Sequence, residues 1–223
     1  SNLDNENDAE GLKSLKTLLN GMLNKKDLIK IIFDFIYFPD NSDDEEKILC
    51  RYPQFYGALS LFNNIQKNLK PNGSGKGGTY FGATGCGKSH TMLFLSRLIM
   101  KNKSLGSPTI IFITDRTDLD DQLSKLFENS KNFLFDENIS SVESRNDLKE
   151  KLKNRKSGGI FLTTIQKFSE DIGLLTERAN IIVIADEAHR SQLNIEEKIE
   201  INTESFKSKF GFAKYLRDSF PNA

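Results

Sequence analysis

Eight consecutive residues near the middle of the chain constrain its local geometry more than any other stretch. They read Gly-Ala-Thr-Gly-Cys-Gly-Lys-Ser and complete the pattern G-x-x-x-x-G-K-[ST]. Glycines let backbone N–H groups converge on a polyphosphate without a side chain blocking the approach. The lysine supplies a mobile positive charge for the outer phosphates, and the final hydroxyl is a ligand for Mg²⁺. The pattern predicts a phosphate-binding loop made of Gly82, Ala83, Thr84, Gly85, Cys86, Gly87, Lys88 and Ser89.

The residues on either side of this loop suit the same interpretation. Residues 78–81 read Gly-Thr-Tyr-Phe, and we predict a short strand there. Residues 90–100 are mostly apolar and predict a helix that begins directly after the loop. The N-terminus of a helix favours anions, because its first N–H groups have no partner within the helix.

Composition narrows the class of protein. Of the 223 residues, 37% are hydrophobic and 28% are charged, which is typical of a globular protein. The 31 Lys and Arg residues balance 31 Asp and Glu residues, so any nucleic-acid binding must use local patches. The two cysteines suggest no disulfide framework, and the longest apolar stretches are too short to cross a bilayer. We therefore expect a cytoplasmic protein with no secretory signal and no membrane partner.

The first 70 residues predict helices and no strands. Leucines and Met22 recur at helical spacing between residues 12 and 23. Further helices are predicted over residues 26–35 and 54–69. Residues 71–78, rich in glycine, predict a flexible joint.

From residue 79 onward the pattern changes to strands that alternate with helices. Continuous apolar runs at 109–114, 159–164 and 181–185 predict strands, with a weaker one at 139–142. Runs without polar alternation indicate that both faces of the sheet are covered. The fold class predicted is α/β, with a parallel sheet between layers of helices and a last helix over residues 212–220.

A second chemical motif, Asp186-Glu187-Ala188-His189, directly follows the third apolar strand. A carboxylate at the carboxyl end of a parallel strand lies where such sheets bind ligands. There Asp186 can hold Mg²⁺, Glu187 can orient or deprotonate an attacking water, and His189 can respond to the bound nucleotide. The alternative is an acidic turn in which Asp186 only caps a helix.

This combination of motifs resembles superfamily 2 helicases and translocases. Three further strings, at residues 113–123, 163–168 and 186–192, are similar to motor motifs of the restriction (R) subunit of type I restriction–modification enzymes. The resemblance implies a P-loop NTPase fold of the RecA-like kind. It also implies a helical lead-in over residues 1–70 and a first motor domain over residues 71–223.

The same resemblance assigns further residues. Gln54, in the string Arg-Tyr-Pro-Gln, would read the adenine edge of ATP. The side chains that would contact DNA are Asp115, Arg116, Thr163, Thr164 and Gln166. The alternative is that the two threonines finish a strand and that residues 115–116 form a surface ion pair. Cys86 departs from the family pattern, because serine is commoner at its position.

By this resemblance the function is that of an ATP-dependent motor that pumps double-stranded DNA. Its cofactors would be ATP and Mg²⁺, and its partners the methyltransferase (M) and specificity (S) subunits. The resemblance also implies a nuclease domain and a second motor lobe beyond these 223 residues, so we expect slow ATP turnover from this stretch alone. Two alternatives stay open: another superfamily 2 helicase or chromatin-type translocase, and a non-catalytic module that senses nucleotide and docks partners.

Overall fold

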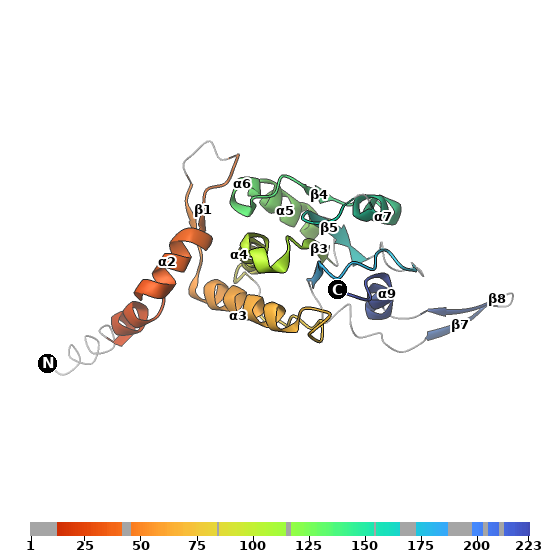
Figure 1. The fold of residues 1–223 in the computed structure, drawn as a ribbon, viewed down its shortest axis with the longest axis horizontal. Helices are drawn as coiled ribbons and strands as arrows, with labels where there is room; N and C mark the ends of the chain where they lie inside the picture. Colours follow the sequence, from red (N-terminus) through yellow and green to blue (C-terminus); the bar gives the residue numbers. More distant parts are fainter. Residues whose placement is uncertain are drawn as a thin grey trace.

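The structure is a computed structural model in which the described residues are 13–41, 46–83, 85–114, 117–153, 155–165, 173–186, 198–202, 205–209 and 212–223. Residues 13–20 are helical, and the elements that follow them are drawn in Figure 1, most of them with labels. In chain order they are α2 (Lys25–Asp34), β1 (Ile36–Tyr37), β2 (Ile48–Leu49), α3 (Tyr52–Asn68), α4 (Lys88–Lys101), η1 (Lys103–Leu105), β3 (Thr109–Thr114), α5 (Thr117–Glu128), α6 (Lys131–Leu134), β4 (Ile139–Ser141), α7 (Arg145–Lys153), β5 (Ile160–Thr164), β6 (Ile181–Ala185), β7 (Lys198–Asn202), β8 (Ser205–Lys209) and α9 (Phe212–Ser219).

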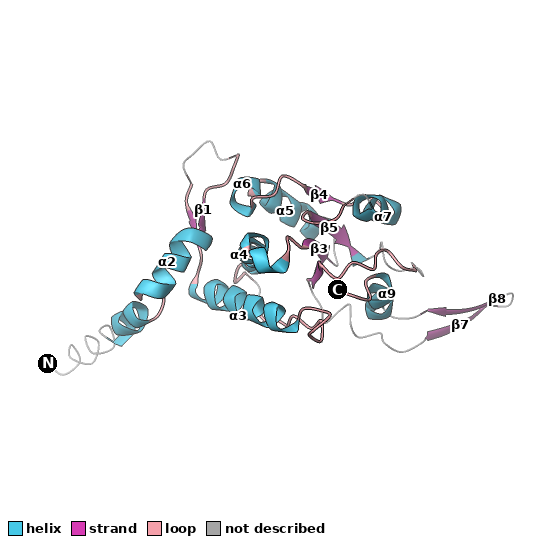
Figure 2. Cartoon of the chain, viewed as in Figure 1, coloured by secondary structure: helices cyan, strands magenta, loops and turns pink. Residues whose placement is uncertain are grey.

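The central sheet has four parallel strands in the order β4-β5-β3-β6. Its strands occupy the apolar runs that the sequence predicts, the weaker run at 139–142 included. Every residue of β3 is buried, because helices cover both faces of the sheet, as Figure 2 shows. The predicted α/β fold with a parallel sheet between helix layers is therefore confirmed.

Alternate residues of the strands build two separate hydrophobic cores. Ile110 and Phe112 of β3 face one side, where they pack with residues of α3, α4 and α5. Ile111 and Ile113 face the other side, where α7 and residues near the C-terminal end of α9 cover them. This division follows from the two-residue period of a strand, which sends successive side chains to opposite faces.

The lead-in segment is helical as predicted, but it also contains a small antiparallel pair, β1–β2. Each of these strands has two residues, which is too short for alternation to be visible in the sequence. Ile31 and Phe35 of the lead-in belong to the same core as Leu93 and Phe94 of α4. Side chains from both sides of residue 70 therefore share one core. A domain boundary at residue 70 remains a prediction.

The prediction of a strand over residues 78–81 is wrong, because these residues have no strand pairing. The segment instead runs back along α3, from the C-terminal end of that helix towards its N-terminal end. Asn64 donates a hydrogen bond to the Gly77 carbonyl at 2.8 Å. A Cβ built at Gly57 would lie 2.6 Å from the Tyr80 ring, so this glycine leaves room for the ring against the helix. Contacts with a helix thus replace the strand pairing that the sequence suggests.

Towards the C-terminus the chain forms an antiparallel hairpin, β7–β8, and then α9. The hairpin projects from the body at the end opposite to α2 (Figure 1). The predicted last helix is confirmed. Over the described residues, no helix combines the length and the apolar character needed to cross a bilayer.

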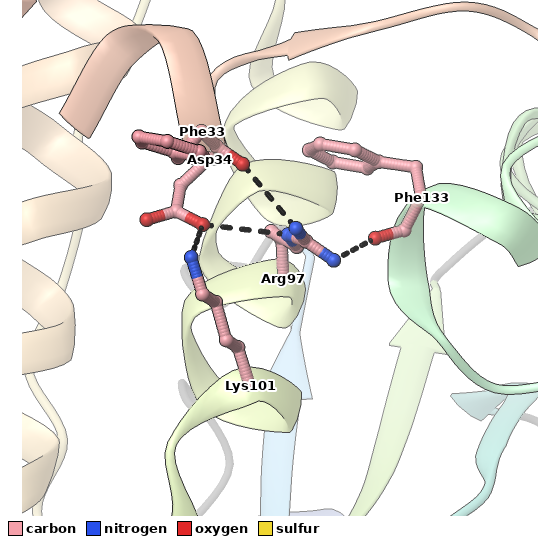
Figure 3. A network of polar contacts seen from close by, with 5 residues as sticks. All are labelled: Phe33, Asp34, Arg97, Lys101 and Phe133. Atoms are coloured by element: carbon pink, nitrogen blue, oxygen red, sulfur yellow. Dashed lines mark hydrogen bonds and ion pairs between the residues drawn. The ribbon is translucent and has the colours of Figure 1, made fainter. Parts of the chain in front are cut away.

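The buried guanidinium of Arg97 links α4 to α2 and α6 (Figure 3). The Arg97 guanidinium donates to the Phe133 carbonyl at 2.6 Å and to the Phe33 carbonyl at 3.2 Å, and it lies 3.5 Å from Asp34. It also stacks over the Phe135 ring at 4.1 Å from the ring centroid. These carbonyls are in the last turns of α2 and α6, where a positive charge is favoured by the helix dipoles. Burial lowers the pKa of Arg97, and Asp34 opposes that shift.

We expect Arg97→Met to destabilise the chain by roughly 2–4 kcal/mol, because it leaves two carbonyls and part of a carboxylate without their buried partner. Lys101→Met is the matched control: it removes an exposed ion pair to the same Asp34, at 2.6 Å, and should cost about 0–1 kcal/mol. Urea unfolding of the two variants measures the difference. Equal losses in both variants would show that Arg97 contributes no more than a surface pair.

Candidate functional site

The predicted phosphate loop leads directly into α4. Gly87 precedes the helix with φ +82°, in the left-handed region that favours glycine. Among the described residues no side chain caps this helix end, and its first turn has no acidic residue. The first N–H groups of α4 are therefore left for an anion, and the helix dipole favours one there.

The loop is compact where it is described. The Cys86 N–H donates to the Ala83 carbonyl at 3.2 Å, and the Lys88 ammonium reaches back to the Gly82 carbonyl at 3.4 Å. A Cβ at Gly82 would lie 2.6 Å from the Cys86 sulfur, so a larger residue at this position would have to displace the Cys86 side chain. Ser89 is exposed, and Thr84 lies outside the described residues. The Lys88 charge thus lies over the loop that the motif assigns to phosphates.

Gln54 is joined directly to this loop, a contact that the sequence did not predict. It is 5% exposed and lies in the first turn of α3. Its Oε1 accepts a hydrogen bond from the Arg51 N–H at 2.7 Å, and its Nε2 donates to the Gly87 carbonyl at 3.2 Å. The first bond lies within the first turn of α3, whereas the second joins residues 33 positions apart.

The two cysteines have different environments. Cys50 is buried, and burial raises the pKa of its thiol to about 11. Cys86, inside the loop, is partly exposed and forms no disulfide.

His90 lies close to the loop, and its pKa is lowered. Burial is the larger cause of this shift, and the Arg51 charge adds to it. His90 is the third residue of α4, and its lowered pKa favours the neutral ring at physiological pH.

The carboxyl ends of three strands line up at one edge of the sheet. Thr114 of β3 pairs with Thr164 of β5, and Ile113 pairs with Ala185 of β6. Asp186 follows β6 at once, and its N–H donates to the Ile113 carbonyl at 2.9 Å. The predicted Mg²⁺ ligand Asp186 therefore lies at the carboxyl edge. Glu187 and His189 lie outside the described residues.

The connection between α4 and β3 brings the phosphate loop towards the same edge. Residues 102–108 join the end of α4 to the start of β3, and α4 packs on the β3 face that carries Ile110. α4 is about 21 Å long and β3 about 20 Å, so a helix that runs antiparallel to the strand begins near the strand's carboxyl end. Because residues 78–81 form no strand, Lys88 does not follow a strand of the central sheet, whereas Asp186 does. Their sharing of one magnesium–triphosphate remains a prediction.

The residues assigned to DNA contact are only partly described. Thr163 and Thr164 are the last two residues of β5, and both are buried. The Thr163 hydroxyl has no hydrogen-bond partner within the described structure. Asp115, Arg116 and Gln166 lie outside the described residues. Their contact with DNA therefore stays a prediction.

Two surface hollows lie away from the loop. One of about 330 Å³ is lined by residues that include Tyr37, Glu46 and Asn129, and burial raises the pKa of Tyr37 to about 12. The other, of about 440 Å³, lies between Lys70 and Asn222. Metal ions in proteins are held by clusters of ligating side chains. Within the described part of the chain, no three His, Cys, Asp or Glu side chains lie together in a way that could hold a metal ion.

Comparison with known proteins gives consistent results. Residues 53–223 match the SWI2/SNF2 ATPase family. The chain is 37% identical over 215 residues to the type I restriction enzyme HindI endonuclease subunit of Haemophilus influenzae, covering 94% of this chain and 20% of that protein. It is 39% identical over 218 residues to the putative type I restriction enzyme MjaIXP endonuclease subunit of Methanocaldococcus jannaschii, covering 94% and 18%. The chain thus spans about a fifth of the length of these two relatives, and the resemblance to this type of subunit is confirmed.

We expect Gly87→Ala to destabilise the chain more than Gly85→Ala does. Both residues have positive φ, which costs a side chain about 1–2 kcal/mol. A Cβ at Gly85 meets nothing within 4 Å, whereas one at Gly87 overlaps the Gln54 amide. The measurement is urea unfolding without ligand. Equal destabilisation by the two variants would contradict the contact between Gln54 and the loop.

Proposed function

Because the chain belongs to the SWI2/SNF2 ATPase family, we propose that it binds Mg·ATP and serves as the ATP-dependent double-stranded DNA translocase motor of a type I restriction endonuclease R subunit. The single observation that carries this proposal is the start of α4. There a glycine loop with a lysine leads into a helix end that no described side chain caps. That helix end lies towards the sheet edge where Asp186 follows β6.

The residues present suit a magnesium–triphosphate. The loop offers backbone N–H groups and the Lys88 ammonium to the phosphates, and the hydroxyl of Ser89 and the carboxylate of Asp186 are oxygen donors of the kind that Mg²⁺ prefers. When bound, Mg²⁺ would offset the charge that develops on the phosphates. Lys88 would hold the outer phosphates, Glu187 would orient or deprotonate the attacking water, and His189 would respond to the nucleotide.

The motor role rests on the relatives. Of the two similar proteins named above, the first is named as the endonuclease subunit of a type I restriction enzyme and the second as a putative one. By analogy, we propose that hydrolysis moves duplex DNA past the methyltransferase and specificity subunits. Asp115, Arg116, Thr163, Thr164 and Gln166 are proposed to face the DNA, where phosphate contacts position a duplex without reading its sequence.

We expect Lys88→Ala to weaken ATP binding by roughly 10- to 100-fold, because a hydrogen-bonded charge on the phosphates is lost. Isothermal titration of the purified chain with Mg·ATP measures the dissociation constant. Lys76→Ala, which removes an exposed lysine of the preceding glycine-rich segment, is the control and should leave the constant unchanged. Equal binding by wild type and Lys88→Ala would refute the assignment of the loop.

We expect Glu187→Gln to lower ATP turnover by about 10²- to 10⁴-fold while ATP binding stays within about twofold, because a general base acts only on the chemical step. Turnover is measured in the R polypeptide assembled with its methyltransferase and specificity subunits on duplex DNA. Unchanged turnover would instead favour the non-catalytic docking module.

A further inference from the structure

Residues 145–156, which form α7 and the turn after it, are strongly basic. They hold six Lys or Arg residues against two Asp or Glu residues, whereas positive and negative residues are equal in number over the whole chain. One of the six, Lys151, is paired with Asp147 at 2.9 Å. Four others form no ion pair within the described part of the chain: Lys149, Lys153, Arg155 and Lys156. These four residues are called the basic stripe below.

The first half of the basic stripe lies on the exposed surface of α7. Leu148 and Leu152 of this helix are buried in the core, whereas Lys149 and Lys153 are exposed. The two lysines are four residues apart, so they are neighbours on the helix surface, and like charges at that spacing destabilise a helix. Glu150 is exposed too, yet it pairs with neither lysine. A bound anion would relieve this repulsion.

The second half of the basic stripe is fixed to the sheet. The Arg155 guanidinium lies over the Phe161 ring of β5, 5.6 Å from the ring centroid. The Arg155 carbonyl accepts a hydrogen bond from the Arg178 guanidinium at 3.0 Å, and burial and then the Arg155 charge lower the pKa of Arg178. The Lys156 carbonyl accepts a hydrogen bond from the Asn180 amide at 3.2 Å. Positive charge therefore gathers at a turn whose backbone is held by hydrogen bonds.

The helix that carries the stripe starts at the edge of the sheet where β5 ends. Ser141, the last residue of β4, pairs with Leu162, and β5 continues to Thr164 at the carboxyl edge. α7 begins four residues after Ser141 and is about 13 Å long. Its end lies towards the opposite edge, because Lys156 is bonded to Asn180, which directly precedes β6. The basic stripe thus extends away from the carboxyl edge along one side of the sheet.

We propose that the basic stripe binds the phosphate backbone of duplex DNA, and that it extends the DNA contacts of the carboxyl edge along α7. The proposal rests on the proposed function, in that DNA is the partner. Each DNA strand carries one charge per 3.4 Å of axis, so a helix of about 13 Å faces about four phosphates. Four unpaired cations suit such a row of phosphates. Contacts of this kind hold a duplex without reading its sequence.

The test is a variant, called the neutral variant, that combines Lys149→Gln, Lys153→Gln and Lys156→Gln. Fluorescence anisotropy measures its affinity for a short duplex at several salt concentrations. Each phosphate contact contributes about 0.9 to the slope of log K against log salt concentration, so we expect the slope to fall by about 2–3 and the affinity at low salt to fall roughly 10- to 100-fold. A duplex of unrelated sequence should give the same change.

Two controls separate the place of the charge from its amount. Arginine at the same three positions keeps the charge, and this variant should bind DNA as wild type does. Lys16→Gln, Lys25→Gln and Lys26→Gln, combined in one variant, remove as much charge from exposed lysines of the lead-in, which lies away from α7 (Figure 1). This lead-in variant should keep the wild-type slope. The affinity for Mg·ATP should be unchanged in all of these variants.

Four outcomes would overturn the proposal. A folded neutral variant with the wild-type slope and affinity would show that the stripe is only solvated surface. Equal losses in the neutral variant and the lead-in variant would show an effect of net charge alone. Wild-type DNA binding together with lost assembly with the methyltransferase and specificity subunits would assign the stripe to an acidic protein surface. Wild-type chain that binds Mg·ATP but no duplex would overturn the DNA-motor role itself, and the role of the stripe with it.

Discussion

The complete burial of β3 is the constraint on which the rest of this structure depends. A parallel strand covered on both faces needs helices on both sides, and each helix must return the chain to the starting edge of the sheet. The carboxyl ends of β3, β5 and β6 consequently gather at one edge, in a register that places Thr114 beside Thr164 and Asp186 beside the end of β3. In such a fold the loops that follow the strands all lie at that edge, which is where sheets of this kind bind their ligands.

Contacts from α2 and α3, which precede it in the chain, and from α6, which follows it, hold the helix that comes after the phosphate loop. Gln54 of α3 bonds to the residue in front of α4, and Arg97 in the middle of α4 bonds to the last turns of α2 and α6. The lead-in is therefore part of what positions the loop, in addition to its share of the common core. This arrangement gives the segment before residue 70 a physical role in positioning the glycine–lysine loop that lies after it.

Membership of the SWI2/SNF2 ATPase family and similarity to type I restriction endonuclease subunits agree with the geometry at the start of α4. The contact between Gln54 and Gly87 follows from how α3 packs against α4 in this chain.

The sequence by itself determined the four strands of the central sheet, most of the helices and the position of the glycine–lysine motif before α4, because continuous apolar runs, helical spacing and that motif are local signals. Tertiary structure alone decided three features: the course of residues 78–81 along α3, the β1–β2 pair and the contact of Gln54 with Gly87. Residues 78–81 have a composition that suits a strand, yet a strand needs a neighbour at its edge, and here Gly57 and Asn64 of α3 offer the competing partner. Which partner a segment contacts depends on residues far away in the chain, and local periodicity carries no information about them.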